Sequence, residues 1–101
     1  MPEGLTITIT SQEPGEVVVA VAGEVDFATG PELAERLLDL TDQDVAVDLS
    51  AVTFLDSSGI AALVRANEAL RPAGHRLRTF GERDNVLRVL EIAGVARLFH
   101  A

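Results

Sequence analysis

The sequence predicts a single α/β domain over residues 1–101, with a mixed sheet of four or five strands and three or four helices in the order ββαβαβα. Three observations carry this prediction. The chain of 101 residues is long enough for one domain and too short for two. Hydrophobic residues make up 48% and charged residues 24% of it, so a packed core can form. The spacing of apolar residues changes repeatedly between about 2 and about 3.6, the periods of strands and helices.

The first two strands are predicted to form a hairpin. Residues 5–10 alternate between aliphatic residues and threonine, a pattern typical of a strand with one buried face. The run 17–22 is almost wholly apolar, which predicts a second strand that is covered on both faces. Pro14-Gly15 lies between the two runs and marks a tight turn.

The first helix is predicted to begin at residues 29–32, Thr-Gly-Pro-Glu. Thr29 and Glu32 have the spacing of a capping box, and a proline in the first turn removes no hydrogen bond. Leucines then recur along one face over residues 33–40. Alternation over residues 45–49 predicts the third strand, and residues 50–56 are predicted as a loop.

The second half of the chain repeats the alternation of helix and strand. A helix is predicted over about 58–71, and the Pro-Ala-Gly sequence at 72–74 ends it. A fourth strand follows at 76–80, and a third helix at about 84–93. Residues 95–99 are the candidate for an additional edge strand.

The charge and residue content exclude several classes of function. The chain carries 16 acidic and 8 basic residues, a formal net charge of −8, and every base is arginine. This excess of negative charge argues against nucleic acid and anionic membranes as partners. Without lysine or cysteine, the chain can form no Schiff base, P-loop, disulfide or thiolate. Its two histidines lack further ligands at metal-binding spacing, so no metal and no other cofactor are predicted.

Two further observations concern location. No run approaches the roughly 18 apolar residues that cross a membrane. The start of the sequence lacks both the basic and the apolar region of a secretory signal. A cytoplasmic protein is therefore expected.

One segment combines polar groups with a favourable position. Residues 54–60, Phe-Leu-Asp-Ser-Ser-Gly-Ile, join the third strand to the second helix, a place where α/β folds often carry sites. The unpaired N–H groups and the dipole of a helix start favour an anion. Ser57 or Ser58 is thus either the cap of the helix or the acceptor of a phosphate, and capping is the simpler interpretation of Ser57. Glu24 and Asp26 follow the second strand, where acids also serve as ordinary turn residues.

Taken in order, the short motifs of this chain resemble a STAS domain, and more closely the bacterial anti-sigma-factor antagonists. Each motif is weak alone, but the ordered set is specific and covers nearly the whole chain. The matching segments are 23–26 with Thr29, 47–50, 54–59, Gly74 and 86–95.

The resemblance implies a regulatory role without enzymatic activity. In that family, the serine directly after the loop aspartate is phosphorylated, which is Ser57 here, with Ser58 as the second choice. The implied kinase is an anti-sigma factor with ATP-dependent serine kinase activity, and a PP2C-type phosphatase reverses the modification. The unphosphorylated antagonist binds the anti-sigma factor and thereby releases the sigma factor. The residues implied in partner binding are Glu24, Asp26, Asp56, Ser57, Ser58 and Gly59.

The sequence departs from the family at two places. It stops at Ala101, whereas many members continue into a further short helix. Ala61-Ala62 follows the serine loop where relatives often have glycine, and the larger side chains affect how closely a kinase can approach.

Other functions stay open at this point. A STAS scaffold or transporter-accessory subunit would share the fold and leave Ser57 unmodified. A small enzyme would pair Ser57 as nucleophile with His75 or His100 as base. A phospho-aspartate receiver built on Asp48 is disfavoured, because the chain lacks the lysine that such chemistry uses.

Overall fold

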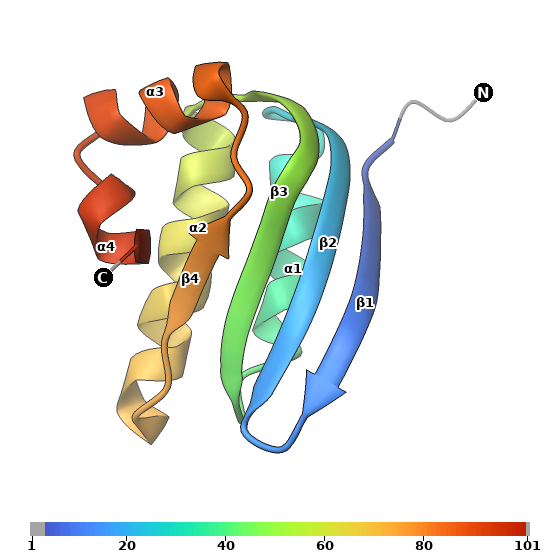
Figure 1. The fold of residues 1–101 in the computed structure, drawn as a ribbon, viewed down its shortest axis with the longest axis vertical. Coiled ribbons are helices and arrows are strands. Elements are labelled where there is room, and N and C mark those ends of the chain that lie inside the picture. Colours follow the sequence, from blue (N-terminus) through green and yellow to red (C-terminus); the bar gives the residue numbers. More distant parts are fainter. Residues whose placement is uncertain (1–3, 101) are drawn as a thin grey trace.

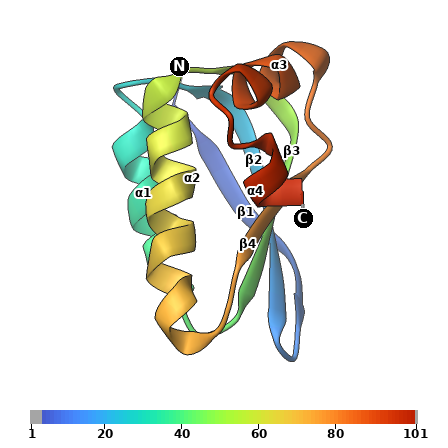
Figure 2. The ribbon, with the colours of Figure 1, turned by 90° about the vertical axis from the view of Figure 1, so that its left-hand side faces the viewer.

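The computed structural model describes residues 4–100, which form a four-stranded sheet with two helices side by side on one face (Figures 1 and 2). The strands are β1 (Thr6–Glu13), β2 (Glu16–Val25), β3 (Asp44–Leu55) and β4 (Leu77–Phe80). The helices are α1 (Gly30–Leu38), α2 (Ser57–Leu70), α3 (Asp84–Ile92) and α4 (Ala96–His100), with a 3₁₀ turn at Arg71–Ala73.

The strands lie side by side in the order of the sequence. β1 is antiparallel to β2, whereas β2, β3 and β4 run parallel to one another. This arrangement confirms the predicted fold class, and the β1–β2 hairpin turns at Pro14-Gly15 as expected. Helix α1 connects β2 to β3 and helix α2 connects β3 to β4, which are the crossover connections that parallel pairing requires.

The core lies between the sheet and the helices α1 and α2 (Figure 2). Along β2, Val17, Val19 and Val21 are buried, because alternate side chains of a strand share one face. Val18 and Ala20 on the other face are half-buried, and no helix packs over them in the described part of the chain. The prediction that this strand is covered on both faces is therefore wrong.

Strand β3 is longer than predicted, because residues 50–55 continue the strand. Buried residues in this part follow a spacing of three, at Leu49, Val52 and Leu55. A regular strand would turn every second residue to the core. Two irregularities against β2 each insert one extra residue into β3, which keeps these three side chains on the core face. The predicted loop over residues 50–56 is thus reduced to Asp56 alone.

Residues 95–99 form no edge strand, and the chain turns there into helix α4. Gly94 adopts a left-handed φ of 78°, and the N–H of Val95 donates to the carbonyl of Leu90 at 3.0 Å, which ends α3. The helix that follows carries Phe99 into the core, where it is fully buried. The additional edge strand predicted over residues 95–99 is therefore wrong, because this segment is helical and buries Phe99 in the core.

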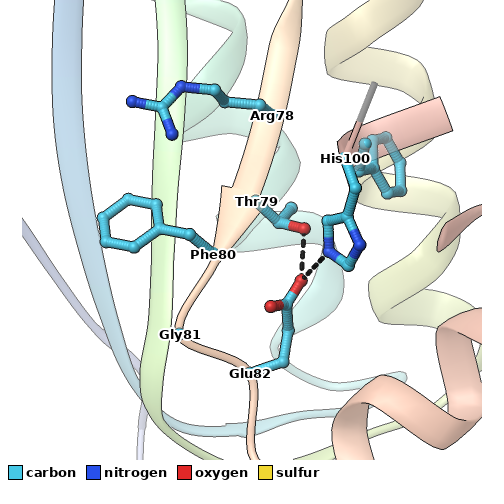
Figure 3. A pocket seen from close by; sticks show the side chains of 7 residues that line it. Arg78, Thr79, Phe80, Gly81, Glu82 and His100 are labelled. Carbon is cyan, nitrogen blue, oxygen red and sulfur yellow. Dashed lines mark hydrogen bonds and ion pairs between the residues drawn. The ribbon is translucent and has the colours of Figure 1, made fainter. Parts of the chain in front are cut away.

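A buried carboxylate links α4 to the turn after β4 (Figure 3). The side chain of Glu82 is 7% exposed, and it borders a cavity of about 290 Å³. Its Oε2 accepts a hydrogen bond from Oγ1 of Thr79 at 2.5 Å and lies 2.6 Å from Nε2 of His100. Burial raises the pKa of Glu82, but the hydrogen bonds from Thr79 and His100 outweigh it and hold that pKa below its ordinary value of 4.5.

The carboxyl ends of β2 and β3 meet at the same edge of the sheet, where Val25 pairs with Leu55. Gly59, in the first turn of α2, packs directly onto this pair. A Cβ added at Gly59 would lie 2.7 Å from Cδ1 of Leu55 and 2.9 Å from Cγ1 of Val25. Because both neighbours are core side chains, only glycine lets the helix start so close to the sheet.

We expect Gly59→Ala to destabilise the domain by about 1–2 kcal/mol, because overpacking of the core outweighs the gain in helix propensity. Gly4→Ala is the matched control, since an added Cβ there meets no atom within 4 Å. Urea unfolding followed by circular dichroism measures both changes, since the chain has no Trp or Tyr for fluorescence. Equal stability of the two variants would contradict the packing argument.

Glu82→Gln removes the charge of the buried carboxylate and keeps its size. Since the pKa of Glu82 is lowered in the folded state, the ionised form stabilises the fold above the ordinary pKa, and this stabilisation disappears as the pH falls through the folded pKa. We expect the variant to lose about 1–2 kcal/mol of unfolding free energy at neutral pH, and progressively less below about pH 4.5. Urea titrations at several pH values test this, and a difference independent of pH would disprove it.

Candidate functional site

Two loops lie next to each other at the carboxyl ends of β2 and β3, the edge where α/β sheets commonly carry their sites. One loop leads from β2 into α1, and the other is Asp56, which leads from β3 into α2. The N–H of Asp56 donates to the carbonyl of Val25 at 3.1 Å, which joins the two loops. The structure therefore brings together the predicted residues of both loops.

Asp56 is the cap of α2, and Ser57 is not. Oδ1 of Asp56 accepts hydrogen bonds from the backbone N–H groups of Ser58 at 2.8 Å and Gly59 at 3.4 Å. These bonds satisfy two of the N–H groups that a helix start leaves unpaired. The interpretation of Ser57 as a capping residue is wrong, because the neighbouring aspartate already fills that role.

The two serines have different surroundings. Ser57 is exposed as the first residue of α2, and its hydroxyl makes no hydrogen bond within residues 4–100. Ser58 is half-buried where α2 meets α1: a Cβ added at Gly30 would lie 3.2 Å from the Cβ of Ser58. A partner therefore has full access to the hydroxyl of Ser57, whereas Ser58 is partly covered where the two helices meet.

Asp26 holds the loop between β2 and α1 in a tight turn. Its Oδ1 accepts from the N–H of Ala28 at 2.9 Å and from the N–H of Thr29 at 3.1 Å. The hydrogen bonds from the backbone of Thr29 and then Ala28 lower the pKa of Asp26, so this carboxyl is ionised at neutral pH.

Thr29 closes the same turn instead of capping α1. Its hydroxyl accepts from the N–H of Asp26 at 3.0 Å and donates to the carbonyl of Glu24 at 2.7 Å. No side-chain hydrogen bond caps this helix, so the predicted capping box of Thr29 and Glu32 is wrong. Glu24, the second-last residue of β2, is exposed.

Neither histidine forms a pair with Ser57. Nδ1 of His75 lies 3.1 Å from Oδ1 of Asp44, which begins β3, whereas Ser57 follows the far end of this 12-residue strand. His100 is paired with Glu82. The candidate arrangement of nucleophile and base is therefore not assembled.

Within residues 4–100, no group of three metal-ligating side chains comes together. No helix in this part of the chain is long and apolar enough to cross a membrane. What the site offers is the exposed hydroxyl of Ser57 next to Asp56, a group that another protein can modify or recognise.

Phe27 is a further exposed residue of this site that the sequence did not indicate, and it lies between Asp26 and Thr29, which close the turn. Its side chain is 80% exposed, the largest value among the exposed large hydrophobic residues of the described chain. One feature of the sequence could have indicated it. Phe27 is an aromatic residue in a polar loop between a strand and a helix, outside the apolar pattern of both.

Comparison with known proteins places this fold among named relatives. A family model described as Mlab, STAS domain, matches residues 9–100. The anti-sigma-B factor antagonist of Listeria monocytogenes is 30% identical over 95 residues, which cover 91% of this chain and 83% of that protein. Its counterpart in Staphylococcus aureus is 35% identical over 85 residues, which cover 81% and 79% of the two chains.

Solved structures agree with this placement. An anti-sigma factor antagonist from Mycobacterium paratuberculosis superimposes with a TM-score of 0.77 at 28% identity, over 98% of this chain and 86% of that one. The phosphorylated form of the Bacillus protein SpoIIAA gives a TM-score of 0.71 over 95% and 89% of the two chains, but at 14% identity it shows the fold alone. These relatives are named as regulators rather than as enzymes. Because the family model and the relatives both span most of the sequence, the chain belongs to the STAS-domain family.

Proposed function

We propose that this chain is an anti-sigma-factor antagonist that is switched by phosphorylation of Ser57. In its unmodified form it binds an anti-sigma factor that is also an ATP-dependent serine kinase, and so releases the sigma factor in the cytoplasm. Phosphorylation by that kinase blocks binding, and a PP2C-type phosphatase restores it. The named relatives, which are anti-sigma factor antagonists, support the class of partner.

The observation that carries this proposal is the free hydroxyl of Ser57 at the start of α2. The capping role that would have engaged this hydroxyl belongs to Asp56. Ser58 is less suited as the acceptor, because it is half-buried beside Gly30 whereas Ser57 is exposed. The choice between the two serines therefore follows from exposure, and it agrees with the order of residues in the family motif.

A phosphate on Ser57 would add about −1.5 to −2 charge beside Asp56. A bare helix start would attract this charge, but Asp56 already occupies two of the N–H groups there with its own carboxylate. The phosphate is then directed outward, toward the partner. A partner surface that fits a neutral hydroxyl meets repulsion and the desolvation of a dianion.

The chain needs no catalytic group of its own for this switch. Phosphoryl transfer depends mainly on positioning and on neutralising charge, and the kinase supplies both with ATP and Mg²⁺. The chain contributes one hydroxyl, on the first residue of a helix that Asp56 caps. This division of roles is consistent with a sequence that contains neither lysine nor cysteine.

Ser57→Asp and Ser57→Asn form a matched pair, because the two side chains have the same size and differ in charge. We expect Ser57→Asp to weaken binding to the anti-sigma factor by about a hundredfold or more, and Ser57→Asn to weaken it by less than about tenfold. Isothermal titration calorimetry with each kinase-type anti-sigma factor encoded in the same genome, against the wild type and the two variants, measures this. Equal dissociation constants for Asp and Asn would rule out a block by charge.

The acceptor serine is tested by incubation with the bound anti-sigma factor and ATP. We expect wild type and Ser58→Ala to take up one phosphate each, and Ser57→Ala to take up none. Intact-mass and peptide mass spectrometry give the stoichiometry and the site. Phosphate on Ser58 in the wild-type protein would overturn the choice of Ser57.

A scaffold or transporter-accessory role predicts a different result in the same assays. Ser57 would stay unmodified, and no anti-sigma factor would bind the wild-type chain. Stable binding to a transporter subunit that is indifferent to Ser57→Asp would then replace the present proposal.

A further inference from the structure

Phe27 is displayed by a loop that has little freedom to move. Asp26 and Thr29, on either side of the segment 27–28, are joined by hydrogen bonds in both directions. The carbonyl of Asp26 also accepts from the N–H of Gly30 at 2.6 Å. An aromatic side chain on a rigid support loses little conformational entropy when a partner covers it, so Phe27 is suited to be an anchor in an interface.

A groove runs beside Phe27 between the first turns of α1 and α2. Its volume is about 210 Å³. The residues along it that matter here are Phe27, Gly30, Ala34, Ser58, Ala61 and Arg65. Because most of these side chains are small, the groove has room for an apolar side chain from another molecule. It begins at Ser58, one residue from the exposed hydroxyl of Ser57.

The charges near the groove indicate what kind of segment would fit. Glu24 is exposed near the end of β2 and Asp26 is ionised directly before Phe27, while Arg65 of α2 lines the groove itself. A complementary segment has an apolar residue for the groove, a basic residue facing the two acids, and an acidic or polar residue facing Arg65.

We propose that Phe27 and this groove are the apolar half of the docking surface for the anti-sigma factor, and that Ser57 lies on its rim. The inference rests on the function proposed above and names the part of the surface that supplies affinity. A phosphate on Ser57 then lies at the edge of this interface, where its charge and its hydration shell oppose close approach of the partner to the groove.

Two other occupants fit the charges less well. A second copy of this chain would bring together two molecules that each carry a net charge of −8, and their mutual repulsion opposes self-association. An anionic lipid surface would be repelled by Glu24 and Asp26 beside Phe27.

The test compares Phe27→Ala with Ile92→Ala, a matched control on α3 whose side chain is 79% exposed. We expect Phe27→Ala to weaken binding to the anti-sigma factor between about 10- and 100-fold, and Ile92→Ala to leave it unchanged. Both variants should keep the thermal midpoint of the wild-type protein, because neither side chain is buried. Ala61→Leu, which fills the groove from an exposed position, should weaken binding as Phe27→Ala does.

The outcomes separate this inference from the function on which it rests. If the wild-type chain binds no anti-sigma factor, the proposed function fails. If the wild type binds, Ser57→Asp does not, and both Phe27→Ala and Ala61→Leu bind like the wild type, the function stands and the groove is not the docking surface. Self-association, or binding to vesicles of anionic phospholipid, that Phe27→Ala abolishes would assign the groove to one of the other occupants.

Discussion

The arrangement of the site depends on the two bonding roles of Asp56. Its backbone N–H ties the end of β3 to the carbonyl of Val25, and its side chain caps α2 through Ser58 and Gly59. A single residue thus joins two strands to the helix that covers them. The direction of the first turn of α2, and with it the exposure of Ser57, follows from these bonds and from the close packing of Gly59.

The loop between β2 and α1 is also fixed by hydrogen bonds between polar side chains and the backbone. Asp26 and Thr29 hydrogen bond mainly to each other and to nearby backbone groups, so their polarity serves the shape of the loop. Phe27 is left on the outside as the group that can meet another molecule. A regulator that acts by binding a partner needs a surface of fixed shape, and these two loops present a hydroxyl and an aromatic ring on such a surface.

Alternation and turn residues were sufficient to predict the fold class, the hairpin and the helices α2 and α3. The predictions failed where tertiary contacts override local preference. Serine is a good cap, yet Asp56 precedes Ser57 with a stronger acceptor, and only the geometry of the turn decides between them. The short apolar run that contains Phe99 fits a strand as well as a helix, and only its packing into the core decides for the helix. The exposure of Phe27 likewise depends on a turn that sequence spacing does not reveal.

The spacing of three along the second half of β3 has a consequence for how this strand can change length. Between Leu49 and Val52, and again between Val52 and Leu55, one residue in each interval is surplus to the pairing with β2. Deleting Ser50, which has no partner of its own on β2, would restore regular alternation between Leu49 and Val52 and leave all three core side chains facing the helices. In an ordinary strand, the same deletion would turn every later side chain to the opposite face. The stretch before the serine loop can therefore lose a surplus residue without inverting the core beneath the site.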